Sequence, residues 1–140
     1  MPTIFLDYGH GGEDPGAIGF GTKEKDITLQ IGKRVKYHLE RHQQKVIESR
    51  EDDSNPSLTE RSNKANANNV DIAVSLHCNA FTSSSAKGVE IYKYSNGNRE
   101  TQLANEILKA IKKSDLYSLD RGVKTENFNM VREIKTASVY

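Results

Sequence analysis

The apolar run over residues 71–76 is the feature that most constrains how this chain can fold. An aspartate opens the run, a histidine follows it directly, and the residues between are almost continuously apolar. A short run of this kind indicates a strand buried on both faces, as in parallel sheets covered by helices. Residues 4–6 and 45–49 predict further strands, and residues 88–94 predict one with alternating apolar positions. We therefore expect a buried, largely parallel sheet.

Helical patterns separate these strands. The first helix presents an apolar face of residues spaced four apart, Ile27, Ile31, Val35 and Leu39. We expect Thr22 or Asp26 to cap its start. Ser57 and Glu60 fit a capping box, which opens a second helix that ends near residue 69 with Leu58, Ala65 and Ala67 facing inward. A third helix is predicted over residues 99–114.

The connections complete the expected organisation. Residues 13–21 and 82–86 are rich in glycine or serine and predict loops. Residues 120–128 predict a loop or a short extended segment, and residues 138–140 the opening of another strand. Alternating strands and helices favour an α/β fold, so we expect residues 1–140 to form a single domain with a mixed, largely parallel sheet flanked by helices.

The composition excludes several classes of protein. Charged residues make up 28% of the 140 residues and the formal net charge is +1, which argues for neither a nucleic-acid partner nor membrane insertion. Cys78 is the single cysteine, so an internal disulfide and a cysteine-based zinc site are excluded, and we expect Cys78 to be a small core residue. The first residues lead directly into a predicted strand, without a basic segment or a long apolar segment, so we expect no signal peptide. We expect cytoplasmic synthesis, with action elsewhere after release.

Polar residues at the ends of two predicted strands suggest a metal site. His10 lies in a turn with glycine on both sides after the first strand, and His77 follows the most apolar strand. Sites in open α/β sheets collect at the carboxyl ends of strands, and Glu24 lies shortly after His10. Two histidines and one glutamate form a familiar catalytic zinc set. The residues alone also fit plainer roles, a surface turn for His10 and a helix-dipole partner for Glu24.

A second histidine pair is a weaker candidate. His38 and His42 lie four residues apart on the first predicted helix, with Glu40 between them. A metalloprotease helix requires its glutamate directly after the first histidine, and Leu39 occupies that position. We interpret the two histidines as a pair at the helix end.

Five segments in order give the chain a family resemblance. They span residues 4–12, 24–26, 75–80, 88–92 and 121–124. Together they resemble the zinc-dependent N-acetylmuramoyl-L-alanine amidases of the amidase type 3 family, particularly phage endolysins and sporulation lytic amidases. The resemblance implies cleavage of the amide bond between N-acetylmuramic acid and L-alanine in peptidoglycan, with His10, Glu24 and His77 as zinc ligands. It implies a protein that lyses the cell wall after release, and we expect a monomer.

The resemblance departs from the family at the end of the chain. A general-base glutamate is expected about two residues past Tyr140, so we expect the chain to lack its last strand and C-terminal end. Glu133 precedes the final strand and is not assigned this role, and Glu90 matches a family position near the site. Asn79 and Arg121 are candidate substrate-binding residues. The alternative is a zinc- and muropeptide-binding fragment without turnover.

Overall fold

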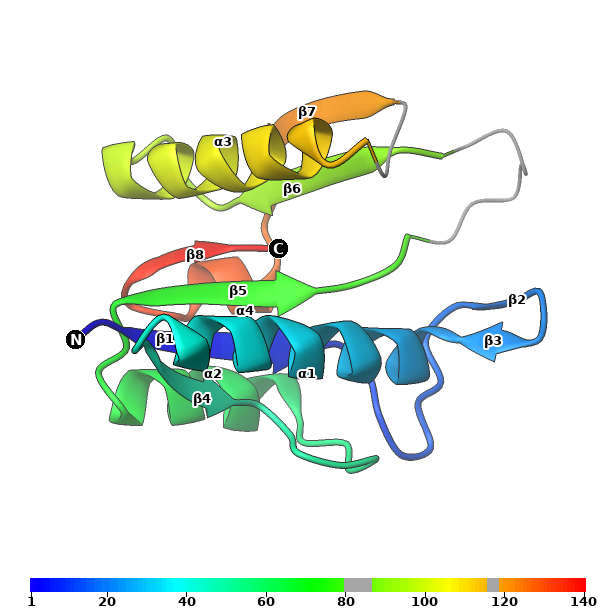
Figure 1. Ribbon diagram of the computed structural model, residues 1–140. Helices are drawn as coiled ribbons and strands as arrows, with labels where there is room; N and C mark the ends of the chain where they lie inside the picture. Colours follow the sequence, from blue (N-terminus) through cyan, green and yellow to red (C-terminus); the bar gives the residue numbers. More distant parts are fainter. Residues whose placement is uncertain (80–86, 116–118) are drawn as a thin grey trace.

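Four parallel strands form the centre of the structure, which is a computed structural model of the chain (Figure 1). The strands are β1 (Thr3–Tyr8), β4 (Lys45–Glu48), β5 (Ile72–Leu76) and β8 (Ala137–Val139). Their order across the sheet is β4-β1-β5-β8. The structure describes residues 1–79, 87–115 and 119–140. The loop predicted over residues 82–86 lies outside these ranges.

A second pair of strands extends this arrangement. β6 (Val89–Lys93) and β7 (Asp120–Thr125) are parallel to each other. Tyr92 and Tyr140 exchange both backbone hydrogen bonds, each 2.9 Å long, which is the pattern of an antiparallel pair. β6 therefore runs beside the end of β8 in the opposite direction (Figure 1). The prediction of a mixed, largely parallel sheet flanked by helices is confirmed.

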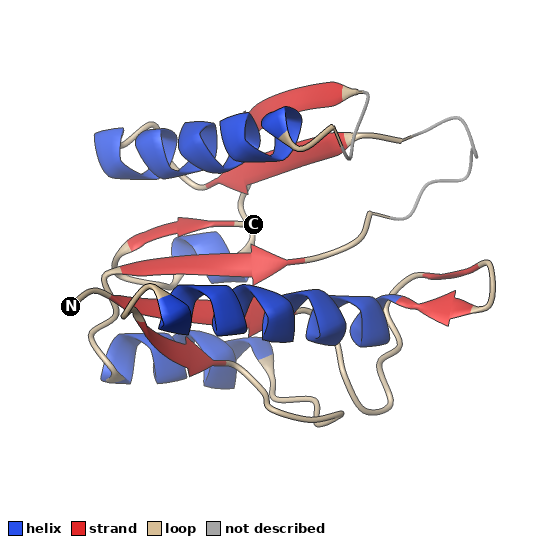
Figure 2. Ribbon diagram, in the orientation of Figure 1, coloured by secondary structure: helices blue, strands red, loops and turns tan. Residues whose placement is uncertain are grey.

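Helices cover both faces of the central sheet (Figure 2). They are α1 (Glu24–Arg41), α2 (Leu58–Ala67), α3 (Asn98–Lys113) and the short α4 (Asn129–Arg132). The alternation of side chains along β1 explains the layers: Leu6 faces α1, and Phe5 faces Ala65 of α2 and Met130 of α4. α3 packs its Leu108 against the end of β8 and against β6. β1 is thus buried on both sides, which keeps its carboxyl end in a fixed place.

The first predicted helix is present, but its details differ from the prediction. Lys23 is the N-cap residue and makes no side-chain capping bond, so neither Thr22 nor Asp26 is the cap. Ile31 is 46% exposed, whereas the neighbouring Gly32 is buried. A Cβ at Gly32 would lie 2.0 Å from the Tyr8 ring. The close approach of Gly32 to Tyr8 of β1 sets the orientation of this helix. A prediction from the spacing of hydrophobic residues does not include a contact made by glycine.

The second predicted helix is confirmed at its start and corrected in its buried face. The Glu60 amide donates to Ser57 Oγ (3.1 Å) and the Ser57 amide to Glu60 Oε2 (2.6 Å), which is the expected capping box. Ala65 is buried as predicted, but Leu58 is 56% exposed and Ala67 is also exposed. Arg61 and Ser62 occupy the buried face together with Ala65.

Some connections contain more regular structure than the sequence indicated. The loop expected over residues 13–21 contains β2 (Ile18–Gly19), which pairs with β3 (Thr22–Lys23) in a short hairpin. The extended alternative for residues 120–128 is correct, because β7 lies there. α4 was not predicted. In the ranges that the structure describes, none of the helices combines the length and apolar character needed to cross a membrane.

Candidate metal centre

The structure brings His10, Glu24 and His77 together at one edge of the sheet. β1 and β5 are direct neighbours, with Tyr8 paired to Leu76, so the residues that follow the two strands leave the sheet side by side. Glu24, the first residue of α1, reaches the same place. One potential ligand atom from each of the three side chains lies within 4.8 Å of the others.

The Glu24 carboxylate is the centre of this cluster. Its Oε1 lies 3.2 Å from His10 Nε2 and 3.1 Å from His77 Nδ1, and it accepts the Cys78 amide at 2.6 Å. Its Oε2 accepts the Ala17 amide at 2.9 Å. Burial raises the pKa of Glu24, but the hydrogen bonds from His77, Ala17 and Cys78 outweigh it and lower the pKa to about 2. Glu24 therefore stays anionic throughout the neutral range.

A carboxylate behind His10 orients its ring. Asp14 Oδ2 lies 2.8 Å from His10 Nδ1, and Asp14 Oδ1 accepts the Gly16 amide at 3.0 Å. The hydrogen bond from His10, followed by that from Gly16, lowers the pKa of Asp14. An acceptor at Nδ1 places the proton there and leaves the lone pair of Nε2 facing Glu24. The sequence reasoning missed Asp14, although a carboxylate four residues after a histidine in one loop was a usable signal.

Two glycines make room for the cluster. A Cβ at Gly9 would lie 2.3 Å from Cε1 of the His77 ring. A Cβ at Gly16 would lie 2.6 Å from His10 Cδ2 and 2.8 Å from Glu24 Cβ, and Gly16 also has a φ of +66°. No side chain at either position fits without displacing one of the three clustered residues. Both glycines thus leave room for the cluster, and Gly16 also provides a left-handed conformation.

Ring packing holds His77. Its imidazole stacks on the Tyr140 ring, with centroids 4.2 Å apart and planes 16° apart, and meets the edge of His10 at 4.9 Å. Burial, and then the negative charge of Glu24, raise the pKa of the Tyr140 phenol. The same two causes raise the pKa of the Cys78 thiol. Cys78 is half-buried, less than expected, and its protonated thiol does not act as a nucleophile at neutral pH.

The cluster fits a divalent metal. Two imidazole nitrogens and a carboxylate oxygen are ligands that zinc accepts in catalytic sites, and Asp14 fixes one imidazole in the tautomer that a metal requires. Among residues 1–79, 87–115 and 119–140, these three side chains form the one such group of three or more histidine, cysteine or acidic residues. His38 and His42 are not members of this group. The His38 ring contacts the Tyr37 ring, and His42 is the C-cap residue of α1.

Asn79 and Arg121, the candidate substrate-binding residues, both contact Glu90. Asn79 Nδ2 donates to Glu90 Oε1 at 2.5 Å, and Arg121 Nε lies 3.2 Å from Glu90 Oε2. Burial raises the pKa of Glu90, but hydrogen bonds from Lys124 and Tyr92 prevail and lower it. Asn79 thus links the segment after β5 to the β6–β7 pair. Their contacts with a substrate remain a prediction.

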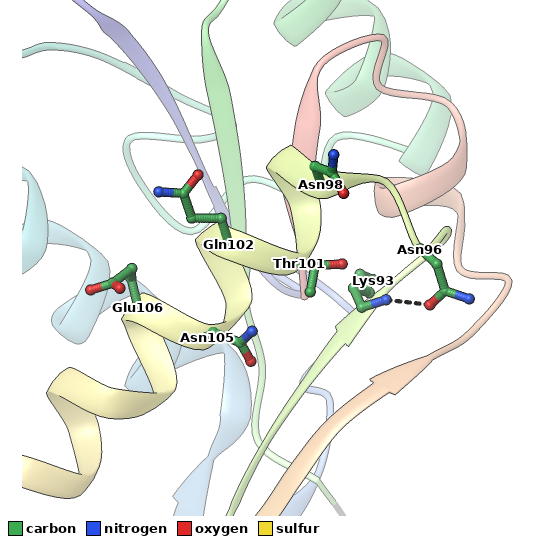
Figure 3. Close-up of a pocket in the computed structure, with 7 residues that line it drawn as sticks. All are labelled: Lys93, Asn96, Asn98, Thr101, Gln102, Asn105 and Glu106. Carbon is green, nitrogen blue, oxygen red and sulfur yellow. Dashed lines mark hydrogen bonds between the residues drawn. The ribbon is translucent and has the colours of Figure 1, made fainter.

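A polar pocket lies elsewhere in the molecule (Figure 3). Its lining is formed by Lys93, Asn96, Asn98, Thr101, Gln102, Asn105 and Glu106. The Lys93 ammonium donates to Ser95 O (3.0 Å) and Asn96 Oδ1 (2.7 Å). β6 runs opposite to β5 (Figure 1). The pocket, which follows the carboxyl end of β6, therefore lies away from the carboxyl end of β5, where His77 follows. The buried Lys93 ammonium is thus already hydrogen-bonded within the protein.

Comparison with known proteins identifies the family. A family model described as N-acetylmuramoyl-L-alanine amidase, the amidase type 3 family, matches residues 4–140. The chain belongs to this family. Members are metal-dependent in general, which agrees with the cluster of His10, Glu24 and His77.

Individual relatives agree with this assignment. The N-acetylmuramoyl-L-alanine amidase LytC of Bacillus subtilis is 41% identical over 98% of this chain and 28% of its own length. The endolysin of Bacillus phage SPP1 is 39% identical over 97% of this chain and 52% of its own length. The catalytic domain of the amidase CwlV from Bacillus (Paenibacillus) polymyxa superimposes with a TM-score of 0.92 and 29% identity, covering 99% of this chain and 78% of that one. The chain spans less than two thirds of LytC and of the endolysin.

Proposed function

We propose that the chain hydrolyses the amide bond between N-acetylmuramic acid and L-alanine in peptidoglycan, with zinc held by His10, Glu24 and His77. The observation that supports this most directly is the convergence of the three ligand atoms within 4.8 Å. Membership of the amidase family supports the reaction and the substrate. We further propose that the protein reaches the cell wall after release from the cytoplasm.

The residues of the chain have distinct roles in this proposal. When bound, zinc supplies Lewis-acid polarisation of a carbonyl and activation of water. Glu24 contributes a full negative charge at neutral pH because its pKa is about 2. Asp14 keeps the proton of His10 on Nδ1, 2.8 Å away, and Tyr140 fixes the plane of His77.

The general base belongs to the proposal as well. The family resemblance expects a glutamate about two positions past Tyr140. Tyr140 stacks on His77 at 4.2 Å, so the residue that follows β8 lies beside the cluster. General acid–base catalysis typically contributes about 10²- to 10⁴-fold to a rate. A chain without that glutamate is expected to bind zinc and muropeptide and to hydrolyse the bond slowly.

Metal analysis and a hydrolysis assay test the proposed site. The purified chain is loaded with zinc and incubated with muropeptide, and new L-alanine amino groups are measured. His10→Ala and His77→Ala are expected to abolish both zinc binding and hydrolysis. His38→Ala is the matched control, since this histidine lies outside the cluster. Equal zinc binding by all three variants would overturn the site.

A second experiment separates an enzyme from a binding fragment. The 140-residue chain is compared with one that continues past Tyr140 and carries the expected glutamate, and with the same longer chain carrying glutamine there. We expect similar muropeptide binding in all three and fast hydrolysis in the glutamate form alone. Equal rates in the two longer chains would exclude this glutamate as the base.

A further inference from the structure

The turn that carries His10 is held from behind by two buried arginines. Arg50 donates from Nε to Tyr8 O (3.0 Å) and from Nη2 to Gly9 O (3.2 Å). Arg61 donates from Nη1 to Tyr8 O (2.6 Å) and from Nη2 to His10 O (2.8 Å). Three successive carbonyl oxygens, those of Tyr8, Gly9 and His10, thus accept hydrogen bonds from cationic groups.

A lysine continues this pattern. Lys25 Nζ donates to Gly12 O at 2.8 Å and pairs with Asp53 Oδ2 at 2.7 Å. Between these anchors His10 has a φ of +66°, which few residues other than glycine adopt. Gly11 follows with a φ of +136°, which glycine adopts without strain. A left-handed conformation at a histidine persists where the surroundings impose it. Here the surroundings include these cationic side chains, together with the hydrogen bonds that join Asp14 to His10 and Gly11.

The two arginines come from different elements and are costly to bury. Arg50 follows β4 and is 2% exposed, and Arg61 lies on α2 and is 3% exposed. Arg61 pairs with the Asp7 carboxylate at 2.9 Å. Arg50 makes further bonds to carbonyl oxygens, those of Lys25 (2.7 Å) and Asp52 (2.8 Å). A buried guanidinium adds little stability relative to apolar residues of the same size. We therefore expect Arg50 and Arg61 to have a role other than stabilising the fold.

We propose that Arg50 and Arg61 are positioning residues that lock the turn after β1, so that His10 stands beside Glu24 and His77 before any metal binds. This inference rests on the proposed metal site. The planar fork of a guanidinium holds two carbonyl oxygens in a fixed relation, which a lysine ammonium does not reproduce. Outer groups of this kind typically change metal affinity by about 10- to 100-fold.

Arg50 offers the cleaner test, because removing Arg61 leaves Asp7 buried without its partner. In Arg50→Met the volume is kept and the hydrogen bonds to Tyr8 and Gly9 are lost. Zn²⁺ affinity, measured by competition with a chelator, is expected to fall by about 10-fold or more. Arg50→Lys is expected to recover part of this loss. Lys36→Met is the control, since Lys36 pairs at 2.6 Å with the exposed Glu40, four residues further along α1.

Amide hydrogen exchange in the metal-free protein provides a readout that does not depend on metal. The amides of Gly9 and Gly11 donate to Leu76 O (3.1 Å) and Asp14 O (3.0 Å), so a locked turn protects them. Arg50→Met is expected to accelerate their exchange about tenfold relative to amides of α3, and Lys36→Met to leave it unchanged. If Arg50→Met does not fold, Arg50→Lys and Lys25→Met are measured in the same way.

The outcomes separate this inference from the proposed function. Faster exchange in Arg50→Met, in a protein whose wild type binds no zinc, would support the positioning role and reject the metal site. Zinc binding by the wild type, with unchanged affinity and exchange in the Arg50 variants, would overturn the positioning role and leave the metal site intact.

Discussion

The two strand ends that carry the histidines hold them in different ways. After β1, His10 lies in a left-handed conformation, with its ring on Asp14 and its carbonyl oxygen on Arg61. After β5, His77 is held by its ring, which stacks on Tyr140 and fills the space beside Gly9. Both histidines contact Glu24, but beyond that shared contact the β1 end is held mainly by charges and hydrogen bonds and the β5 end mainly by ring packing. Substitutions that change one of these properties should affect the two ends unequally.

The largest effect is expected for Glu24→Gln, because Glu24 is shared by both ends. The substitution removes the negative charge, and an amide nitrogen in place of either oxygen would face the Ala17 or Cys78 amide donor. The loss of Zn²⁺ affinity should exceed the roughly 10- to 100-fold that follows removal of an outer group. Competition titration measures it. Glu106→Gln, an exposed change on α3, should bind zinc as the wild type does.

Gly9→Ala tests the role of volume at the β5 end. The new Cβ would lie 2.3 Å from the His77 ring, so the ring must move. We expect Zn²⁺ affinity to fall by about tenfold and the free energy of unfolding to fall by about 1–3 kcal/mol, as overpacking typically costs. Urea unfolding and metal titration measure these effects. A Cβ at Gly19 would meet no atom within 4 Å in the described part of the chain, apart from Gly19 itself and its two chain neighbours, so Gly19→Ala should change neither value.

Asp14→Ala tests the role of charge at the β1 end. Without the acceptor at 2.8 Å, the His10 proton is free to occupy either ring nitrogen, and part of the population presents N–H to the cluster. We expect Zn²⁺ affinity to fall by about tenfold, and Asp14→Asn, which keeps a carbonyl acceptor, to lose less. Tautomer populations of His10, measured by nitrogen chemical shifts, should change while those of His77 stay constant. A shift at His77 of the same size would break the distinction between the two ends.

The two histidines of the cluster were predictable because their positions at the ends of strands depend on backbone geometry alone. Once β1 and β5 are parallel neighbours, His10 and His77 must lie at the same edge. The capping box of α2 was predictable for a similar reason, since its two bonds join residues three apart. The family resemblance, carried by short motifs, named the same three residues.

The rest of the site was missed because its residues are polar and distant in sequence. Arg50 and Arg61 come to the turn from 40 or more residues away, and hydrophobic periodicity assigns charged residues to the surface. The same assumption led to Leu58 being placed inward, where Arg61 is the buried residue. A buried polar network requires the tertiary fold to be known before its partners can be named.

The smallest effect is expected at Glu90, which tests whether the β5 end also depends on charge. Asn79, two residues after His77, donates to Glu90, as do Lys124 and Tyr92. The pKa of Glu90 is lowered from its ordinary value of about 4.5. The unfolded chain therefore binds this proton more readily, and the stability that Glu90 contributes is present above pH 4.5 and is lost as the pH falls through the folded-state pKa.

Glu90→Gln removes this contribution, which we expect to be about 1 kcal/mol at pH 7 because the partners of Glu90 are partly exposed. Urea unfolding of the metal-free protein at pH 7, 5 and 3.5 measures it. The difference between wild type and variant should stay constant from pH 7 to pH 5 and then shrink. Zn²⁺ affinity at pH 7 should change by less than it does in Gly9→Ala. If the Zn²⁺ affinity of Glu90→Gln falls as much as that of Gly9→Ala, His77 depends on the hydrogen bonds of Glu90 as His10 depends on Asp14. The two strand ends would then be held by the same kind of interaction.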